Sequence, residues 1–174
     1  MIVNSHNDWD PLEEIIVGHA HHSRIATDIS ARSFSYANFN KEDVEKLEGP
    51  YPQWVIDEAN EDADGLAKAL EDLGVIVHRP KIIDWENVNY DIGQGWNTKG
   101  WYSWCPRDLI LPLGDMLIET PTPVRARYFE TKLYEDIMYE AFEDGALWLQ
   151  APKPNLHDNM YTFEDIEDKA TLLD

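Results

Sequence analysis

Two stretches of the chain carry apolar residues at helical spacing. Over residues 53–73, apolar side chains recur every three or four positions, and acidic residues lie mostly between them. This pattern predicts an amphipathic helix that ends at Gly74. Its apolar stripe consists of Val55, Ala59, Ala63, Leu66, Leu70 and Leu73. A second stripe predicts another amphipathic helix over residues 127–144, ended by Gly145.

Short apolar runs on either side of these helices predict strands. Residues 15–17 and 75–77 flank the first helix, and residues 109–113, 116–119 and 146–149 surround the second. The run over 109–113 is typical of a buried strand. The Gly-Asp pair that separates it from the next run indicates a hairpin turn. The resulting order of strands and helices indicates an α/β fold.

Three further segments show no sustained period. Residues 26–52 predict a long, partly ordered excursion of the kind that forms lids or binding loops. Residues 83–100 are rich in glycine and amide side chains and predict a loop. Residues 155–174 form an acidic tail, for which we expect a short helical turn near residues 163–167.

The strands and helices fall into two similar units. Residues 109–150 give the order strand, strand, helix, strand, and residues 13–78 give a looser version of it. Tandem units of this kind usually need neighbours on both sides to bury their faces. Two of them alone leave sheet edges open, so we expect an incomplete assembly whose isolated chain associates.

Composition narrows the class of protein. The chain has 174 residues, enough for one domain with a real core. Its 34 acidic and 14 basic residues give a net charge of −20, which opposes binding to nucleic acid and to anionic membranes. Cys105 is the single cysteine, so the chain has no internal disulfide or thiolate cluster. The first residues lack the pattern of a signal or transit peptide, and the sequence predicts a cytoplasmic protein.

Histidines 19, 21 and 22 are the strongest candidates for metal ligands. Three histidines within four residues of an irregular segment do not give the converging geometry that zinc needs. No carboxylate-histidine helix motif accompanies them. We therefore expect no metal and no cofactor.

The segment GWYSWCPRD, residues 100–108, places a tyrosine, an arginine and an aspartate where a loop enters the strand 109–113. Asp108 can accept two parallel hydrogen bonds from a planar guanidinium, so it is a candidate site for a cationic ligand. The alternative is that Arg107 and Asp108 pair with the backbone or with neighbouring side chains.

Five blocks of the sequence carry a resemblance to a known family. They read NSHNDWDPLEEIIVG, VIVHRPKIIDW, GWYSWCPRDLIL, IETPTPVRARYFE and DGALWLQAPKP. With them the chain closely resembles the glycine (arginine:glycine) amidinotransferase family of the guanidino-group-modifying, or pentein, superfamily. The resemblance implies an α/β propeller of five ββαβ modules, of which this chain would form about two. Module one would span about residues 1–80 and module two about 100–152, followed by the acidic tail 155–174.

The resemblance also implies a reaction and a set of residues. In the family, arginine passes its amidino group to a cysteine nucleophile, and an acceptor amine such as glycine then takes it, giving ornithine and guanidinoacetate. Asp108 matches the aspartate that holds the substrate guanidinium, and Tyr102 matches a tyrosine of the arginine site. Arg107 matches in type, and we assign it a structural role in positioning Asp108. Cys105 falls where relatives usually carry methionine, so it is not the nucleophile.

The family's catalytic aspartate, histidine and cysteine would fall in blocks beyond residue 174. We therefore expect no catalytic residue in this chain, which would be the N-terminal portion of an amidinotransferase, truncated or completed by a second chain or a homo-oligomer. Without a thiolate, covalent amidine transfer has no nucleophile. The alternatives are a non-catalytic arginine-binding or regulatory module, and a hydrolase of the same superfamily such as an arginine deiminase. The first block and the block at residues 102–108 favour the transferase.

Overall fold

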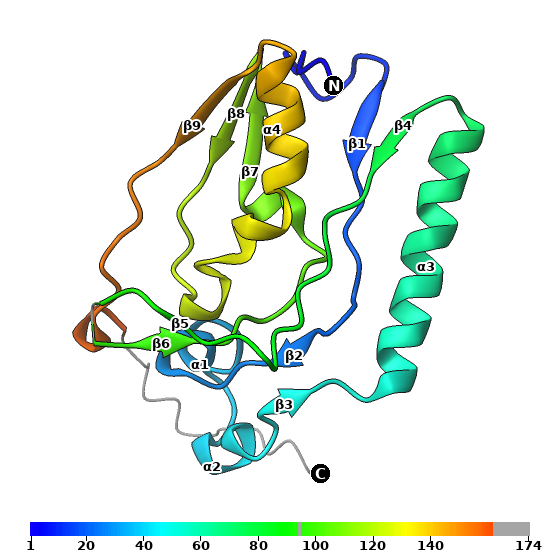
Figure 1. The fold of residues 1–174 in the computed structure, drawn as a ribbon. Helices are drawn as coiled ribbons and strands as arrows, with labels where there is room; N and C mark the ends of the chain where they lie inside the picture. The colour runs from blue at the N-terminus through cyan, green and yellow to red at the C-terminus, as the bar shows by residue number, and fades with distance from the viewer. Residues whose placement is uncertain (94, 162–174) are drawn as a thin grey trace.

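A computed structural model describes residues 1–93 and 95–161, in which short strands and four α-helices alternate (Figure 1). The strands are β1 (Glu14–Ile16), β2 (Arg24–Ile25), β3 (Gly49–Pro50), β4 (Ile76–His78), β5 (Tyr90–Asp91), β6 (Asn97–Thr98), β7 (Ile110–Leu113), β8 (Met116–Glu119) and β9 (Leu147–Gln150). The α-helices are α1 (Ile29–Ser35), α2 (Lys41–Glu45), α3 (Gln53–Asp72) and α4 (Glu135–Glu143). Four 3-10 turns complete the described part: η1 (Pro106–Asp108), η2 (Arg125–Arg127), η3 (Glu130–Leu133) and η4 (Asp158–Met160).

The first unit is a parallel pair of strands joined through α3. β1 pairs with β4 so that Ile15 lies opposite Val77. Both strands were expected from the sequence, and each lies within one residue of its predicted bounds. Gly74 follows α3 at a φ of 87° and lets the chain turn into β4. The predicted strand, helix, strand order is confirmed.

The face that α3 buries differs from the predicted stripe. Its buried residues are Ile56, Asn60 and Ala67, whereas Leu66 is 54% and Leu73 is 81% exposed. On the buried face, the Asn60 side chain accepts a hydrogen bond of 2.7 Å from the backbone N–H of Ala20. Among the described residues, no helix combines the length and apolar character required to cross a membrane.

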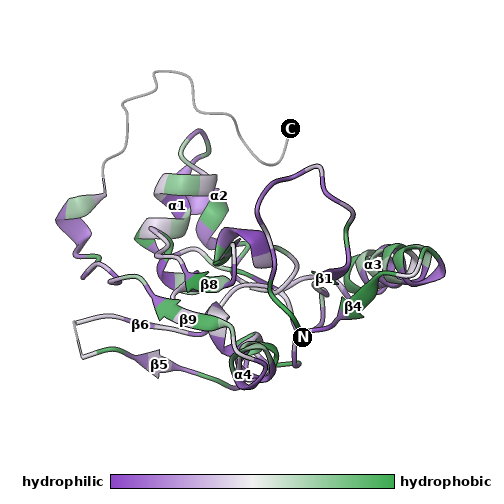
Figure 2. Ribbon diagram, turned by 90° about the horizontal axis from the view of Figure 1, so that it is seen from above, coloured by the Kyte–Doolittle hydropathy of each residue, from purple (hydrophilic) through white to green (hydrophobic). Residues whose placement is uncertain are grey.

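The second unit is a three-stranded sheet with α4 on one side (Figures 1 and 2). β7 and β8 form the predicted antiparallel hairpin, and β9 joins β8 in parallel. Ile110 and Leu117 face a core that includes Met138 and Ala141 of α4. The prediction of a buried strand at residues 109–113 is correct for Leu109 and Ile110, which are 1% and 4% exposed, and wrong for Leu111 and Leu113, which are about half exposed.

The second predicted helix begins eight residues later than expected. Residues 127–134, which carry its first predicted turns, form 3-10 turns, and α4 starts only at Glu135. The side chain of Arg127 folds back onto Glu130, three residues along. This spacing suits the tighter 3-10 turn, in which side chains at i and i+3 eclipse.

The two predicted loops contain more structure than expected. Residues 26–52 include α1, α2 and β3, and β3 pairs with β2. Asp28 and Asn40 cap the two helices, which are too short to show a period in the sequence. Residues 83–100 include the antiparallel pair β5 and β6. The helical turn expected near residues 163–167 lies outside the described residues.

Gly100 is the point where the backbone passes over a buried tryptophan. It has a φ of 113°, and a Cβ atom there would lie 2.3 Å from the ring of Trp85. Trp85 is 1% exposed and belongs to the core of the second unit. Only glycine fits both the backbone conformation and the space.

We expect Gly100→Ala to lower the free energy of unfolding by more than the left-handed backbone alone explains. That conformation costs about 1–2 kcal/mol for a non-glycine residue, and overpacking against Trp85 adds about 1–3 kcal/mol. Urea denaturation followed by tryptophan fluorescence measures the change. The control is Gly74→Ala, at a φ of 87° with no atom near its Cβ position. Equal losses in the two variants would contradict the role of Trp85.

A second prediction concerns Glu14, which accepts a 2.8 Å hydrogen bond from His78 across β1 and β4. Burial acts to raise the pKa of Glu14, but the hydrogen bonds from His78 and from the backbone of Ile2 outweigh it and hold that pKa below its usual value. A lowered carboxyl pKa stabilises the fold above the usual pKa and loses this effect as the pH falls. We expect Glu14→Gln to lower the free energy of unfolding by about 1 kcal/mol at pH 6. The loss should shrink below pH about 4.5. A loss that does not change with pH would contradict a stabilising role for the ionised Glu14 carboxylate.

Candidate functional site

The turn η1 sets Asp108 at the entrance to β7. Pro106 occupies its first position, and the backbone N–H of Leu109 closes the turn on the Pro106 carbonyl at 3.1 Å. The Thr120 hydroxyl, just after β8, donates to the backbone carbonyl of Asp108 at 2.8 Å. The backbone is therefore held from two sides, while the Asp108 side chain stays 52% exposed.

Asp108 binds the guanidinium of Arg127. Arg127 Nη1 donates to Asp108 Oδ2 at 2.6 Å. The same guanidinium makes a bidentate pair with Glu130, from Nε to Oε2 at 2.6 Å and from Nη2 to Oε1 at 3.0 Å. The side chains of Arg127 and Glu130 are 8% and 1% exposed. One buried cation thus joins a buried carboxylate to a half-exposed one.

Tyr102 lies against the same guanidinium. Its ring centroid is 4.8 Å from Arg127 Cζ, in cation–π geometry, and its ring stacks on Trp104 at 5.1 Å. Burial raises the pKa of Tyr102 to about 12, so the side chain is a neutral phenol at physiological pH. We refer to Tyr102, Asp108, Arg127 and Glu130 as the Arg127 cluster.

Cys105 contributes its backbone to this cluster. Its carbonyl accepts a 3.3 Å hydrogen bond from Arg127 Nη2. Burial and the nearby charge of Asp108 raise the pKa of the thiol above its ordinary value. A thiol with a raised pKa is a poor nucleophile, which agrees with a structural role for this residue.

Burial and pairing shift the pKa values of the two buried members of the cluster, Arg127 and Glu130. Burial acts to lower the pKa of Arg127, but the hydrogen bond and charge of Glu130 outweigh it, and Arg127 stays charged. Burial raises the pKa of Glu130 to about 7, against the lowering effect of Arg127. The cluster can therefore hold the Asp108 carboxylate in a fixed orientation and present it to a cationic group.

Two residues of the cluster, Arg127 and Glu130, were not identified from the sequence. The contact that holds Asp108 comes from Arg127, and the described structure records no hydrogen bond or ion pair between Asp108 and the exposed Arg107. The alternative that Asp108 pairs with a neighbouring side chain is thus correct for one contact, the one with Arg127. The spacing of Arg127 and Glu130, three residues apart after two prolines, is the signal that could have identified them.

The three histidines turn to different partners. The contacts are between His19 Nδ1 and Ser103 Oγ at 3.2 Å, between His21 Nδ1 and Asn60 Nδ2 at 3.3 Å, and between His22 Nδ1 and Asp84 Oδ1 at 3.5 Å. Burial lowers the pKa of His19 below its ordinary value. A neutral His19 bonded to Ser103 serves to join the two units.

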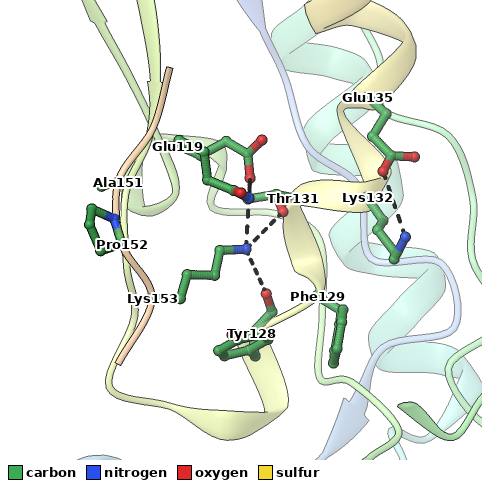
Figure 3. Close-up of a pocket in the computed structure, with 10 residues that line it drawn as sticks. Glu119, Tyr128, Phe129, Thr131, Lys132, Glu135, Ala151, Pro152 and Lys153 are labelled. Atoms are coloured by element: carbon green, nitrogen blue, oxygen red, sulfur yellow. Dashed lines mark hydrogen bonds and ion pairs between the residues drawn. The ribbon is translucent and has the colours of Figure 1, made fainter. Parts of the chain in front are cut away.

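A cavity of about 420 Å³ lies between the ends of β8 and β9 and the turn η3 (Figure 3). The Lys153 side chain extends into this cavity (Figure 3). Its Nζ donates to the Tyr128 carbonyl at 3.0 Å and to Thr131 Oγ1 at 3.4 Å, and lies 3.7 Å from Glu119 Oε2. Burial lowers the pKa of Lys153 in spite of the nearby Glu119. Tyr102 and Asp108 do not line this cavity, so the Arg127 cluster is a separate place on the surface.

Arg125 organises a second hollow, of about 570 Å³. Its guanidinium lies over the rings of Trp96 and Tyr161, at 5.1 and 5.4 Å, and pairs with Asp158 at 2.6 Å. It also donates to the backbone carbonyl of Leu156. These contacts fasten residues 156–161 to the body of the protein.

The chain is similar in sequence to several known amidinotransferases. The chain is 43% identical over 161 residues to inosamine-phosphate amidinotransferase 1 of Streptomyces glaucescens, covering 92% of this chain and 46% of that protein. It is 38% identical over 173 residues to L-arginine:L-lysine amidinotransferase of Pseudomonas savastanoi pv. phaseolicola, covering 97% and 46%. It is 35% identical over 179 residues to mitochondrial glycine amidinotransferase of Xenopus laevis, covering 98% and 41%. No family model matches the chain.

Solved structures agree with the sequence comparisons. The inosamine-phosphate amidinotransferase of Streptomyces griseus matches with a TM-score of 0.87 and 40% identity, over 94% of this chain and 47% of that one. An amidinotransferase of Microseira wollei in the saxitoxin biosynthetic pathway matches with a TM-score of 0.77 and 36% identity, over 92% and 45%. The chain spans about half the length of the curated relatives it matches. The predicted fold class, a partial pentein-type α/β propeller, is confirmed.

The Arg127 cluster yields a prediction about stability. We expect Arg127→Met to lower the free energy of unfolding by about 3–5 kcal/mol, because it leaves the buried Glu130 without its cation. Urea denaturation at pH 8 measures the loss. The loss relative to wild type should be smaller at pH 5. Burial raises the pKa of Glu130, so in the variant this carboxyl is protonated and uncharged at pH 5, whereas at pH 8 it must either carry an unpaired buried charge or hold its proton at a cost.

Arg79→Met is the matched control. Arg79 pairs with Asp64 at 2.8 Å, but their side chains are 32% and 70% exposed. Exposed pairs contribute about 0–1 kcal/mol. A loss at Arg127 no larger than that at Arg79 would show that the cluster is not a structural centre.

Proposed function

We propose that the chain, which spans about half the length of the amidinotransferases it matches, is their N-terminal portion and supplies the arginine-binding side of an enzyme that transfers the amidino group of arginine to an amine. Module one would be the unit of β1, α3 and β4, and module two the unit of β7, β8, α4 and β9. The remaining half would provide the nucleophile, either as further chain or as a second polypeptide.

The observation that carries this proposal is that the Asp108 carboxylate is held by an ion pair and is still accessible to solvent. Its carboxylate already binds one guanidinium, that of Arg127, through Oδ2 at 2.6 Å. More than half of the side chain is nevertheless exposed. A carboxylate can accept up to about four hydrogen bonds, so a second guanidinium can approach from the open side.

The proposed role of Asp108 is to hold the substrate guanidinium and to balance its charge. A fixed carboxylate orients the guanidinium carbon for attack and stabilises positive charge during transfer. Tyr102, a neutral phenol packed under Arg127, would contact the same substrate. Arg127 and Glu130 would keep Asp108 in place, the supporting role that the sequence assigned to Arg107.

The transfer would proceed in two displacements. A cysteine thiolate of the other half would form a bond to the guanidinium carbon as the bond to the ornithine nitrogen breaks, and ornithine would leave with a proton. The acceptor amine would then form its bond to the amidino carbon and release the thiolate, and its nitrogen would give up a proton that replaces the one taken away by ornithine. With glycine as acceptor the product is guanidinoacetate. The names of the relatives include glycine, lysine and an inosamine phosphate, so the proposed acceptor class is a primary amine.

We expect the chain to bind L-arginine weakly, with a dissociation constant of about 1 mM, because only one side of the site is present. Saturation-transfer NMR detects binding in this range. Asp108→Asn should weaken the signal at least tenfold, and citrulline, which lacks the positive charge, should give none.

Asp115→Asn is the control, because Asp115 is an exposed aspartate in the β7–β8 turn. Arginine binding equal in the wild type and in Asp108→Asn would contradict the proposal. A loss of stability in Asp108→Asn without any change in arginine binding would assign Asp108 to the ion pair alone.

A further inference from the structure

Glu130 is a carboxylate of the Arg127 cluster that a ligand cannot touch. Its side chain is 1% exposed, whereas that of Asp108 is 52% exposed. Both carboxylates nevertheless bind the same guanidinium, that of Arg127. A ligand at the cluster therefore contacts Asp108, and Glu130 can act on that ligand only through its charge and through Arg127.

The guanidinium of Arg127 divides its hydrogen bonds unequally between the two carboxylates. It donates two to Glu130, from Nε and Nη2, and one to Asp108, from Nη1 to Oδ2. Its Nη2 also donates to the backbone carbonyl of Cys105. Within residues 1–93 and 95–161, no other side chain pairs with the Asp108 carboxylate. Glu130 thus holds the larger share of the cation, and Asp108 keeps its second oxygen for a ligand.

The charges of the cluster do not cancel. Two ionised carboxylates, Asp108 and Glu130, share one cation, Arg127, so the cluster carries a net charge of about −1. A proton on Glu130 removes this net charge and leaves Asp108 and Arg127 as a neutral ion pair. At the surface of a protein, a unit charge several ångströms from a ligand changes the affinity by about tenfold. A cationic ligand therefore distinguishes between the two states of Glu130.

We propose that Glu130 sets the affinity of Asp108 for a guanidinium, because it neutralises Arg127 from the buried side and leaves the charge of Asp108 to the ligand. This inference rests on the proposed function, in which the ligand is arginine. Glu130 is then a positioning residue that also determines specificity. Without its charge, the cluster loses the net attraction that favours a charged guanidinium over a neutral group of the same shape.

Glu130 also makes this affinity depend on pH. Burial raises the pKa of Glu130 to about 7, against the lowering effect of Arg127, and the charge of Asp108 acts to raise it further. Burial raises the pKa values of the other hydroxyl and thiol groups of this neighbourhood, which therefore stay neutral between pH 5 and pH 8: Tyr102, Cys105 and Tyr134. Because Glu130 takes up a proton as the pH falls through about 7, the affinity for a guanidinium should fall with it.

The test is an NMR titration of the whole 174-residue chain with L-arginine and, separately, with methylguanidine, at pH 5 and pH 8. Both ligands keep their guanidinium charge over this range. We expect the wild type to bind each ligand about tenfold more weakly at pH 5 than at pH 8. Glu130→Gln keeps the size of the side chain and removes its charge. It should bind about tenfold more weakly than the wild type at pH 8 and should lose the pH dependence.

Glu14→Gln is the matched control. It removes a largely buried carboxylate of the first unit, where Glu14 pairs with His78. This variant should keep the affinities and the pH dependence of the wild type. A pH dependence that comes from histidines would persist in Glu130→Gln. Urea midpoints at both pH values show whether each variant is folded under the conditions of the titration.

A second measurement needs no variant. Because the effect of one bound species on another is reciprocal, a ligand that prefers ionised Glu130 also makes Glu130 harder to protonate. The titration midpoint of the Glu130 carboxyl carbon, followed by 13C NMR, should move about one pH unit lower when either ligand is saturating. If Glu130→Gln fails to fold, this shift in the wild type decides.

The outcomes separate this inference from the proposed function. Arginine binding that is equal in the wild type and in Glu130→Gln at pH 8, or a Glu130 midpoint that neither ligand moves, would overturn the inference and leave the function in place. Methylguanidine binding with the expected dependence on Glu130, but no binding of arginine, would support the role of Glu130 and overturn the arginine-binding function. If neither ligand binds, both are overturned.

Discussion

The buried guanidinium of Arg127 is the interaction on which the second unit depends. A charge taken out of water is tolerated only when it is paired and hydrogen-bonded. Arg127 meets this condition by binding Glu130 in η3 and Asp108 in η1. These contacts fix the entry of β7 relative to the turns that lead into α4. The position of Asp108 is thus set by the core and not by its own exposed surroundings.

The two units are joined through Ser103. Its carbonyl accepts hydrogen bonds from the Tyr134 hydroxyl at 3.2 Å and from the backbone N–H of His19 at 3.4 Å. A Cβ atom on Gly18 would lie 2.4 Å from the same carbonyl oxygen. Glycine is therefore required for the first unit to approach this close. The segment of residues 100–108, which carries Tyr102 and Asp108 of the candidate site, therefore also forms the contact between the two units.

Sequence patterning predicted the elements that are long or locally paired. The helix α3, the hairpin of β7 and β8, and the glycines that end α3 and α4 follow from periodicity and turn chemistry. The turns η2 and η3 were missed because the apolar spacing of residues 127–144 fits a continuous helix, whereas in the structure Arg127 ends η2 and pairs with Glu130 at the start of η3. The helices α1 and α2 depend on caps and tertiary contacts and show no period of their own. The chemistry of Asp108 made it a candidate from the sequence, but its partner Arg127 became evident only from the contact between distant segments in the structure.

The parallel pairing of β1 with β4 has a consequence for how the chain folds. Ile15 lies opposite Val77, so this pair must close a loop that contains the whole of α3, whereas Leu113 lies opposite Met116 across a tight turn. Each doubling of a flexible loop adds about 0.6 kcal/mol to the entropy cost of closure. The hairpin of the second unit therefore has the lower entropic barrier, and the β1–β4 pair is favoured to form after it. The half of the chain that carries Asp108 can take shape before its N-terminal neighbour docks.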